Sequence, residues 1–485
     1  MRRTALAVLL TGAALLPGAT AAGSAPAARQ AQQASPNVVV IMTDDQTVES
    51  VRVMTNVKRL LRDRGATFAS SFATFSLCCP SRATFLTGQY AHNHGVLGNA
   101  PPEGGYAKLD HTNTLPVWLQ DAGYYTAHLG KYLNGYGRSD PREIPPGYDE
   151  WRGSVDPTTY RFYGYTLNEN GRLVTYERAY QADVYARKAV RIIQRRAPLA
   201  RPFFLSVAFL APHSGGPREP GDPVGQATPV PAPRHRNDFA AAPLPRPPGF
   251  NERDVSDKPV GIRSRPRLTP ARIRKIRENY QQRLESLLAV DEAVARIVAA
   301  LRRAGELDET LIVFTSDNGF FHGEHRVPSG KVLLYEPSIR VPLIMRGPGI
   351  PAGLRLTQRV GNIDLAPTIV DAAGAAAGRV LDGRSLLPLF ANPQLTLGRD
   401  LLIERGPGSG TFAAVRAPRY LYAEYGNGER ELYDLRRDPY ELKSRHADPA
   451  YAAVRADLAV RLDRLRTCSG VTCRTRPVTR LSADN

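Results

Sequence analysis

Two adjacent cysteines, Cys78 and Cys79, stand directly before Pro-Ser-Arg in a chain of 485 residues that contains only four cysteines. A cysteine side chain can be a nucleophile, a metal ligand or half of a disulfide. The other pair, Cys468 and Cys473, encloses a short polar loop. In an oxidising compartment we expect a local disulfide there, although other pairings of the four cysteines remain open. A bridge between neighbouring residues needs strained geometry, so the first pair is the candidate for a reactive role.

Polar side chains follow segments that are expected to be buried strands. The segments are residues 37–42, 202–211 and 309–316, and the polar residues after them are Asp44, Asp45, His213, Asp317 and Asn318. In parallel sheets ligands gather beyond the carboxyl ends of the strands, so these side chains are expected to converge. Carboxylate and amide oxygens suit Ca²⁺ or Mg²⁺ better than zinc. The alternative is that each group belongs to an ordinary turn at a strand end.

The elements that would position these residues alternate between strands and helices. Residues 57–65 are expected to form a helix, and residues 114–131 a helix followed by a strand. Thr269 and Pro270 provide an N-cap and a first helical residue for a long amphipathic helix that ends near Gly305. This alternation predicts an α/β fold with a large, mostly parallel sheet that is covered by helices on both faces.

The N-terminus has the pattern of a secretory signal peptide, with two arginines, an apolar run and small residues before a cleavage site. We assign residues 1–21 to this signal and residues 22–36 to a disordered lead-in. No apolar run is long enough to cross a membrane. Lysine and arginine exceed acidic residues by 18, which favours anionic partners, although arginines scattered over solvated faces would explain it equally well. No nucleic-acid-binding motif is present, so nucleic acid is not an expected partner.

The cysteine segment resembles the signature of the sulfatase family. It reads Cys78-Cys79-Pro80-Ser81-Arg82-Ala83-Thr84-Phe85-Leu86-Thr87-Gly88. Further similar segments follow in the family's order from residue 37 to about residue 465, among them MTDDQ, LAPHS, FTSDNG and ELYDLRRDPYE. Looser similarities, such as GKYLNGY and GQYAHNHGV, are closest to the N-acetylglucosamine-6-sulfatase and heparan-endosulfatase branch.

The resemblance implies an alkaline-phosphatase-like sulfatase fold with a smaller C-terminal domain built on an antiparallel sheet. We expect a catalytic domain at residues 37–395, a small α+β subdomain at residues 396–467 and a tail with the local disulfide at residues 468–485.

The resemblance also implies the chemistry. Cys78 would be oxidised to formylglycine by the formylglycine-generating enzyme, and the hydrated aldehyde would be the nucleophile. Ca²⁺, with Mg²⁺ as the alternative, would be bound by residue 78 together with the oxygen ligands Asp44, Asp45, Asp317 and Asn318. Arg82 would contact the hydrated aldehyde and the metal-binding carboxylates. The remaining catalytic residues would be Lys131 and Lys331, which neutralise sulfate oxygens, and His213, which lies near the ester oxygen; Lys331 or His213 would protonate the departing alcohol.

One departure concerns the residues after Lys131. Many arylsulfatases have a histidine two residues later, whereas this chain has Tyr132, Leu133 and Asn134. The base that usually occupies this position is therefore unassigned.

Candidate contacts to substrate are Asn134, His94 and His325, with His92 and His322 as weaker ones. Cys79 fills a variable position, where a buried structural role is expected. The proline- and arginine-rich residues 212–270 are predicted to line the pocket entrance, with Arg234 and Arg236 facing a polyanion.

These features predict a secreted sulfuric ester hydrolase that removes sulfate from a sulfated saccharide resembling N-acetylglucosamine-6-sulfate. One alternative keeps the fold and acts on aryl sulfates, or on phosphate or phosphonate esters. Another is an inactive protein that binds polyanions and leaves Cys78 unmodified, but binding alone would not need the metal ligands and lysines.

Overall fold

The structure is a computed structural model that describes residues 7, 9, 35–408 and 410–475. Apart from residues 7 and 9, the predicted signal peptide lies outside the described residues, as do most of the predicted lead-in and the end of the predicted tail. The account below concerns residues 35–475. Among the described helices, none has the length and apolarity needed to cross a membrane.

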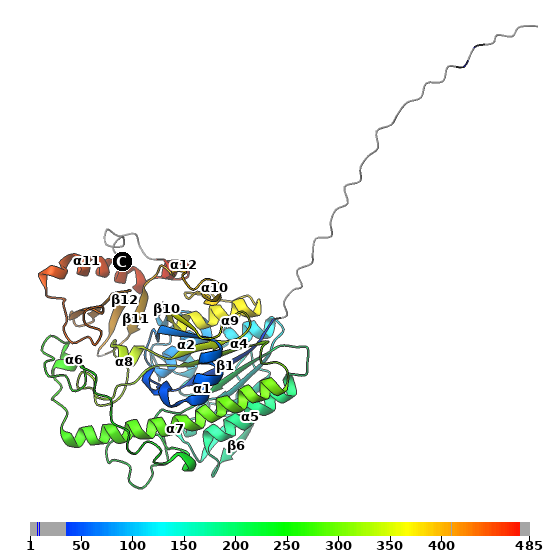
Figure 1. Ribbon diagram of the computed structural model, residues 1–485, viewed down its shortest axis with the longest axis horizontal. Coiled ribbons are helices and arrows are strands. Elements are labelled where there is room, and N and C mark those ends of the chain that lie inside the picture. Colours follow the sequence, from blue (N-terminus) through cyan, green and yellow to red (C-terminus); the bar gives the residue numbers. More distant parts are fainter. Residues whose placement is uncertain (1–6, 8, 10–34, 409, 476–485) are drawn as a thin grey trace, which may run out of the picture. The chain divides into compact units, whose positions relative to one another are not determined.

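A large sheet forms the centre of the fold (Figure 1). Its strands are β1 (Asn37–Thr43), β2 (Ala66–Phe72), β3 (Tyr125–Gly130), β4 (Glu150–Ser154), β5 (Tyr165–Glu169), β6 (Arg172–Tyr176), β7 (Phe203–Ala208), β8 (Thr310–Ser316), β9 (Leu343–Arg346) and β10 (Leu354–Gly361). They lie in the order β10-β2-β9-β8-β1-β7-β3-β4-β5-β6. The run β8-β1-β7-β3-β4 is parallel throughout, whereas β9, β5 and β6 pair antiparallel with their neighbours. The predicted α/β fold with a mostly parallel sheet is confirmed.

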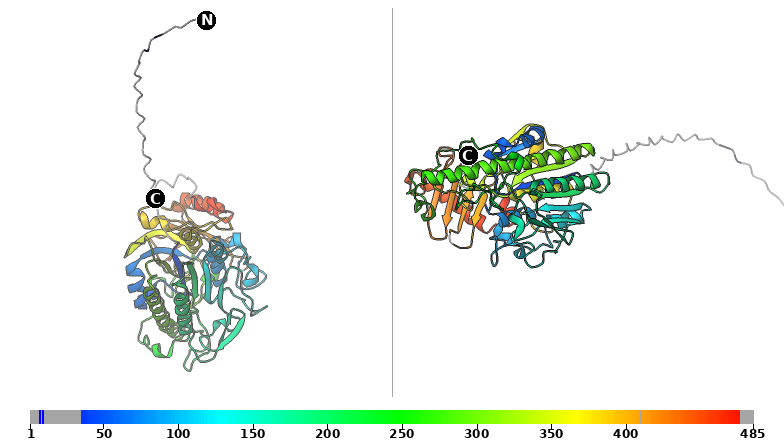
Figure 2. Two further views of the ribbon diagram at one scale, coloured as in Figure 1. Left: turned by 90° about the vertical axis from the view of Figure 1, so that its right-hand side faces the viewer. Right: turned by 90° about the horizontal axis from the view of Figure 1, so that it is seen from below.

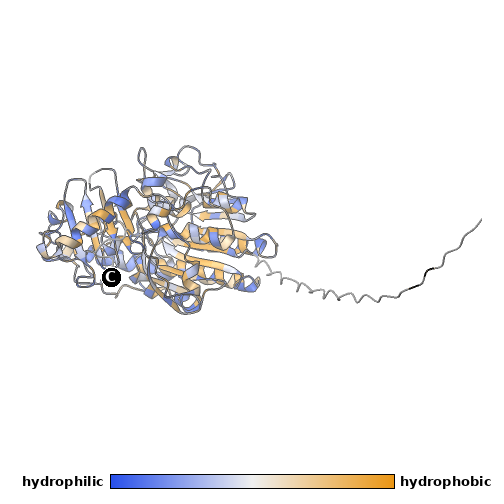
Figure 3. Cartoon of the chain, turned by 90° about the horizontal axis from the view of Figure 1, so that it is seen from above, coloured by the Kyte–Doolittle hydropathy of each residue, from blue (hydrophilic) through white to orange (hydrophobic). Residues whose placement is uncertain are grey.

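Helices cover both faces of this sheet. The described helices are α1 (Thr55–Leu60), α2 (Cys78–Thr87), α3 (Ala91–His94), α4 (Leu115–Asp121), α5 (Gln181–Arg196), α6 (Val260–Arg263), α7 (Pro270–Arg303), α8 (Glu336–Ile339), α9 (Leu365–Ala373), α10 (Leu387–Ala391), α11 (Ala452–Arg466) and α12 (Val471–Arg474). Val39 and Ile41 of β1 pack in one core with α1, α5 and α7. Val38 and Val40 point the other way, into a core with α2, α4 and α9. Because both faces are buried, the strand is a continuous apolar run, and the sheet strands are mostly orange in Figure 3.

The long helix α7 begins as its sequence predicts. The Thr269 side chain accepts a hydrogen bond from the backbone N–H of Arg272, and Pro270 is the first helical residue. The helix ends at Arg303, and Gly305 follows with φ of 77°. This helix runs beside α5 on one face of the sheet (Figure 2).

A second, antiparallel sheet follows in the chain. Its strands are β11 (Leu401–Arg405), β12 (Phe412–Arg416), β13 (Tyr420–Tyr425) and β14 (Arg430–Asp434), in that order. The apolar face of α11 packs on this sheet through Leu458 and Leu462. Beyond it, Cys468 and Cys473 form a disulfide with Cα atoms 5.0 Å apart. Cys79, by contrast, is a free thiol with no exposed surface in the core below α2.

The proline-rich residues 212–270 contain one short α-helix, α6, and one turn of 3₁₀-helix among otherwise irregular backbone. Arg234 does not face an open surface: it is bridged to Asp183 and Glu292, at 2.8 and 2.5 Å. Arg236 is paired with Glu219. Both guanidinium groups are therefore already matched by carboxylates of this chain, contrary to the expectation that they face a polyanion.

Candidate active site

The register of the parallel strands brings the predicted site residues to one edge of the sheet. Thr43 of β1 pairs with Ser316 of β8, and β7 connects β1 to β3 through Ala208, which pairs with Met42 and Gly130. The residues that follow these strands therefore leave the sheet side by side.

Gly130 is required at this edge. Its φ is +105°, and a Cβ atom at this position would lie 2.1 Å from the carbonyl oxygen of Ala208. The absence of a side chain lets β3 approach β7 closely, and this approach sets the position of Lys131, which comes next in the chain.

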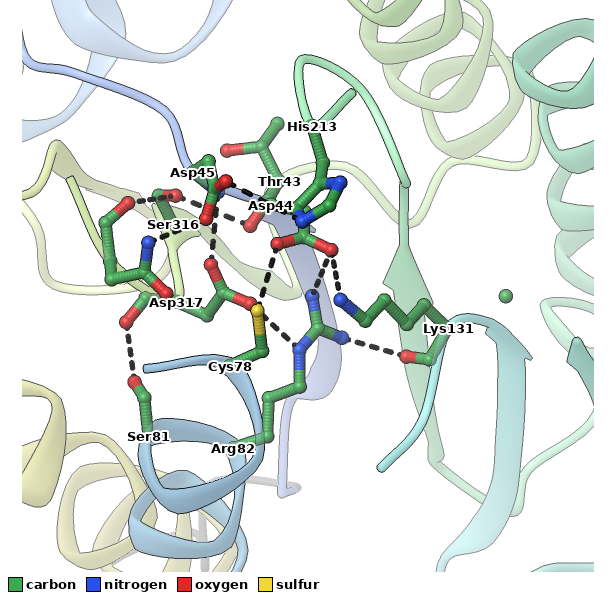
Figure 4. A network of polar contacts seen from close by, with 12 residues as sticks. Thr43, Asp44, Asp45, Cys78, Ser81, Arg82, Lys131, His213, Ser316 and Asp317 are labelled. Atoms are coloured by element: carbon green, nitrogen blue, oxygen red, sulfur yellow. Dashed lines mark hydrogen bonds and ion pairs between the residues drawn. The ribbon is translucent and has the colours of Figure 1, made fainter. Parts of the chain in front are cut away.

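Cys78 is the first residue of α2 and points toward the strand ends (Figure 4). Its Sγ lies 3.4 Å from Oδ1 of Asp44 and 3.1 Å from Nζ of Lys331. Ligand atoms of Cys78, Asp44, Asp45 and His213 all lie within 4.8 Å of one another, a spacing that a metal ion could bridge. Residue 78 also lies at the positive end of the α2 helix dipole, which favours an anion, although the N–H of Cys79 already donates to Asn99 and Pro80 has none.

Three cations surround the acidic group. Lys131 forms an ion pair with Asp44, and Lys331 forms one with Asp45. Arg82, one turn into α2, donates from Nε to Asp317 over 2.8 Å and from Nη1 to the carbonyl oxygen of Lys131 over 2.7 Å. Arg82 thus ties the start of α2 to the ends of both β8 and β3.

Asn318 completes the acidic side of the site. Its Nδ2 donates to Asp45 Oδ1 over 2.6 Å, while its Oδ1 is buried and has no hydrogen-bond partner. A buried acceptor without a donor is costly unless a cation satisfies it. The donor set is oxygen-rich, as hard divalent cations require. The residues present therefore fit a Ca²⁺ or Mg²⁺ ion.

The charges perturb the ionisation of the site. Burial opposes ionisation of Asp44, but Lys131, His213 and Arg82 outweigh it and hold the pKa of Asp44 well below its usual range. Burial and the neighbouring charge of Asp44 raise the pKa of Asp317 to about 6. Burial and Asp44 also raise the pKa of the Cys78 thiol to about 12. An unmodified Cys78 is therefore a neutral thiol in this environment.

His213 lies at the open side of the cluster. Its Nε2 is 3.6 Å from Oδ2 of Asp45, and burial lowers its pKa to about 4, although Asp44 and Asp45 oppose this shift. Together with Tyr160, Ser214 and Arg218 it lines a cavity of about 550 Å³. The first part of the 212–270 segment therefore lines a cavity beside His213.

Two residues that the sequence did not single out hold the site together. Tyr160 ends a 3₁₀ turn (Thr158–Tyr160), and its ring centroid lies 4.5 Å from Lys131 Nζ and 4.8 Å from the His213 ring. Arg283 of α7 donates to the carbonyl oxygens of Asp45 and Pro212 and lies over Phe320. A charged residue beside the apolar stripe of α7 was the only signal for Arg283, and Tyr160 carried none.

The structure separates the candidate substrate contacts. Asn134 does lie beside the site, because its Nδ2 donates to the hydroxyl of Tyr160 over 2.7 Å. His94 does not: it is buried, with Nε2 paired to Thr84 and Nδ1 accepting from the backbone N–H of Val96, so its role is structural. His92 instead pairs with Glu404.

His325 is also held away from Cys78. Its Nδ1 pairs with Glu252 over 2.6 Å and its ring packs on Tyr335. With His322 it lines a different cavity, of about 560 Å³. The expectation that His325 contacts substrate at the Cys78 site therefore finds no support in its position.

Comparison with known proteins identifies the family. Residues 36–375 match the Sulfatase family, and residues 323–468 match the N-sulphoglucosamine sulphohydrolase C-terminal family. The chain is 33% identical to human N-acetylglucosamine-6-sulfatase, over 91% of this chain and 86% of that protein. It is 35% identical to an arylsulfatase of Volvox carteri, over 98% of this chain and 79% of that protein.

A solved structure of a protein with its substrate D-glucosamine-2-N,6-O-disulfate superposes with a TM-score of 0.75 at 25% identity, over 89% of this chain and 97% of that one. The matches span both sheets and include the cysteine segment, the strand ends and the lysines described above. The chain belongs to the sulfatase family and is a sulfuric ester hydrolase.

Proposed function

We propose that this sulfatase is secreted and removes the 6-O-sulfate from a glucosamine-type saccharide resembling N-acetylglucosamine-6-sulfate. The observation that carries the catalytic part is the position of Cys78, whose Sγ contacts both Asp44 and Lys331 at the start of α2. The substrate class is supported by the relatives named N-acetylglucosamine-6-sulfatase and by the 6-O-sulfated ligand of the superposed structure.

In this proposal residue 78 acts as formylglycine, made by the formylglycine-generating enzyme, and its hydrated aldehyde supplies the attacking hydroxyl and a second hydroxyl for release of sulfate. Residue 78 and the four oxygen ligands Asp44, Asp45, Asp317 and Asn318 would hold Ca²⁺, or Mg²⁺ in its place. When bound, the cation lowers the pKa of a coordinated hydroxyl and neutralises charge on a sulfate oxygen. The orphaned Oδ1 of Asn318 supports this assignment.

The chain's own groups bind and orient the sulfate. Lys131 comes from the end of β3 and pairs with Asp44, and Lys331 comes from the loop before α8 and pairs with Asp45. They neutralise sulfate oxygens, and the positive end of the α2 helix dipole favours the same anion. Arg82 keeps α2 aligned with the strand ends through Asp317.

The departing alcohol takes its proton from Lys331 or His213. Nζ of Lys331 lies 3.1 Å from Sγ of Cys78, and His213 lines the cavity of about 550 Å³ that the saccharide would occupy. His213 is neutral at neutral pH because burial lowers its pKa to about 4, whereas the carboxylates, Asp45 foremost, hold the pKa of Lys331 above its usual range despite burial. Lys331 therefore carries the proton that can be donated.

Secretion rests on the N-terminal pattern of residues 1–21, and the disulfide between Cys468 and Cys473 is consistent with an oxidising compartment. An arylsulfatase is the second candidate, favoured by the 35% identity to the Volvox enzyme.

The first test is the mass of the tryptic peptide of residues 65–82 from protein exported by its host. Formylglycine exchanges one sulfur for oxygen and removes two hydrogens relative to Cys78, and this lowered mass is the expected result. An unmodified thiol would contradict the proposed nucleophile.

The second test compares kcat/KM for N-acetylglucosamine-6-sulfate, 4-nitrophenyl sulfate and 4-nitrophenyl phosphate, with Cys78→Ala as the inactive control. We expect the amino-sugar sulfate to be preferred. Faster turnover of the aryl sulfate would favour the arylsulfatase alternative, and faster turnover of the phosphate ester would refute sulfate as the preferred group.

A further inference from the structure

A basic groove runs between α5 and α7 on the outer face of these two helices, which lie side by side in Figures 1 and 2. It has a volume of about 490 Å³ and is lined by Arg187, Val190, Arg191, Gln194, Ala295, Arg296, Ala299 and Arg303. Arg187 and Arg191 are one turn apart on α5, and Arg296 and Arg303 are two turns apart on the facing side of α7. We call this feature the arginine groove.

The positive charge of the arginine groove is not cancelled locally. In the part of the chain that the structure describes, Arg187, Arg191 and Arg303 form no ion pair with a carboxylate, and all three are exposed. Arg296 approaches Asp183 and Glu292 only to 3.9 Å.

Those two carboxylates are already neutralised from the other side. Arg234 bridges them, with Asp183 at 2.8 Å and Glu292 at 2.5 Å. The two carboxylates beside the groove are thus neutralised by Arg234, which lies outside it. The guanidinium groups inside the groove therefore remain available to bind an anionic ligand.

The side chains that line the arginine groove favour one class of anionic ligand over others. Guanidinium groups bind sulfate and carboxylate oxygens in pairs, and the small side chains of Val190, Ala295 and Ala299 leave the floor of the groove shallow and smooth. No aromatic side chain lines it, so nucleobases would find no stacking platform. A linear polysaccharide with sulfates along its length needs only regularly spaced cations.

We propose that the arginine groove binds a chain of sulfated polysaccharide at a site separate from the catalytic cavity. Arg303 is the last residue of α7 and comes shortly before the start of β8 at Thr310. Cys78 and its partners instead lie beyond the opposite ends of the strands, after Thr43 and Ser316. A polymer in the groove therefore leaves the catalytic opening free. The groove retains the enzyme on the polymer and raises the local concentration of cleavable groups.

This inference goes beyond the proposed function, because binding in the groove does not require turnover. The test uses the full-length protein with Cys78→Ala, so that the polymer is not consumed, and long heparin as the probe. The groove variant carries Arg187→Gln, Arg191→Gln and Arg303→Gln. A matched control carries Arg172→Gln, Arg277→Gln and Arg464→Gln, three exposed arginines elsewhere that change the net charge equally.

We expect the groove variant to bind heparin about tenfold more weakly or worse, and to show a smaller dependence of affinity on salt, since it loses three charge-assisted contacts. The control is expected to change little. In the background with Cys78 intact, both triple variants are expected to hydrolyse a sulfated monosaccharide at the parental rate, which shows that they are folded and separates this test from the test of catalysis.

Three results would overturn the proposal. Equal losses in the groove variant and the control would assign heparin binding to net charge alone. Full retention of affinity by the groove variant would exclude the groove. Competition by duplex DNA as strong as that by heparin of the same length would exclude a preference for sulfated polysaccharide.

Discussion

Tyr160 provides the sharpest test of how this site is held together. Its ring faces the Nζ of Lys131 at 4.5 Å and the ring of His213 at 4.8 Å, and its hydroxyl accepts from Asn134 over 2.7 Å. If the ring positions the two catalytic side chains, Tyr160→Leu should impair catalysis more than Tyr160→Phe, because only the first removes the aromatic face.

The expected magnitudes follow from these contacts. Tyr160→Phe removes one hydrogen bond and leaves Nδ2 of Asn134 without an acceptor, which costs about 1 kcal/mol, or roughly fivefold in kcat/KM. Tyr160→Leu also removes the cation–π contact with Lys131, worth about 2 kcal/mol where water is excluded, so its total loss should be about 100-fold. Most of it should appear in kcat, because the proposed function places Lys131 and His213 at the reacting ester.

The assay is steady-state hydrolysis of a sulfated monosaccharide at saturating Ca²⁺, with thermal unfolding of each variant measured alongside. Tyr163→Leu is the matched control, since Tyr163 lies three residues further on and packs on Tyr180 instead of the site. Equal losses for Tyr160→Phe and Tyr160→Leu would refute the role of the ring, as would a loss for Tyr163→Leu of the same size.

Three further predictions concern stability and metal binding. Gly130→Ala should lower Tm far more than Gly171→Ala. Both glycines have a positive φ, which costs an alanine about 1–2 kcal/mol of stability, but only a Cβ at residue 130 would clash with a backbone oxygen, at 2.1 Å. Equal decreases in Tm would contradict this reasoning. One ring nitrogen of His92 contacts Glu404 and the other contacts the carbonyl oxygen of Cys468. Burial opposes protonation of the ring, but the hydrogen bond to Glu404 outweighs it and raises the pKa of His92. The stabilisation by protonated His92 should be complete below pH about 6.5 and should disappear as the pH rises through the raised folded-state pKa. In urea unfolding, the free energy of unfolding of His92→Gln should lack this pH dependence. A chelator should lower Tm, and Ca²⁺ at about 100 times its Kd should restore about 2.7 kcal/mol of unfolding free energy. A Tm that the chelator leaves unchanged would contradict a bound cation.

The sequence predicted the framework of the site because that framework depends on local signals. Continuous apolar runs followed by acidic or amide residues marked β1 and β8, and the N-cap and proline at Thr269 and Pro270 marked the start of α7. The convergence of Asp44, Asp45, Asp317 and Asn318 then followed from a general property of parallel strands.

Other predictions required information that no local pattern contains. His94 and His325 lie close in sequence to site motifs, yet each ring is held by an internal partner, Thr84 in one case and Glu252 in the other. Arg234 looked available to a polyanion until its position between two carboxylates was known. A side chain's partners come from other elements of the fold, so its availability to a ligand is decided by packing.

The sequence by itself determined the strand–helix alternation, the long helix and the set of candidate site residues, because hydrophobic periodicity, capping and motif spacing all act over a few residues. Only the tertiary structure decided that Tyr160 and Arg283 support this set and that α5 and α7 face each other with unpaired arginines. These relations join residues from different elements of the fold, and they exist only once the sheet has brought its strand ends and covering helices together.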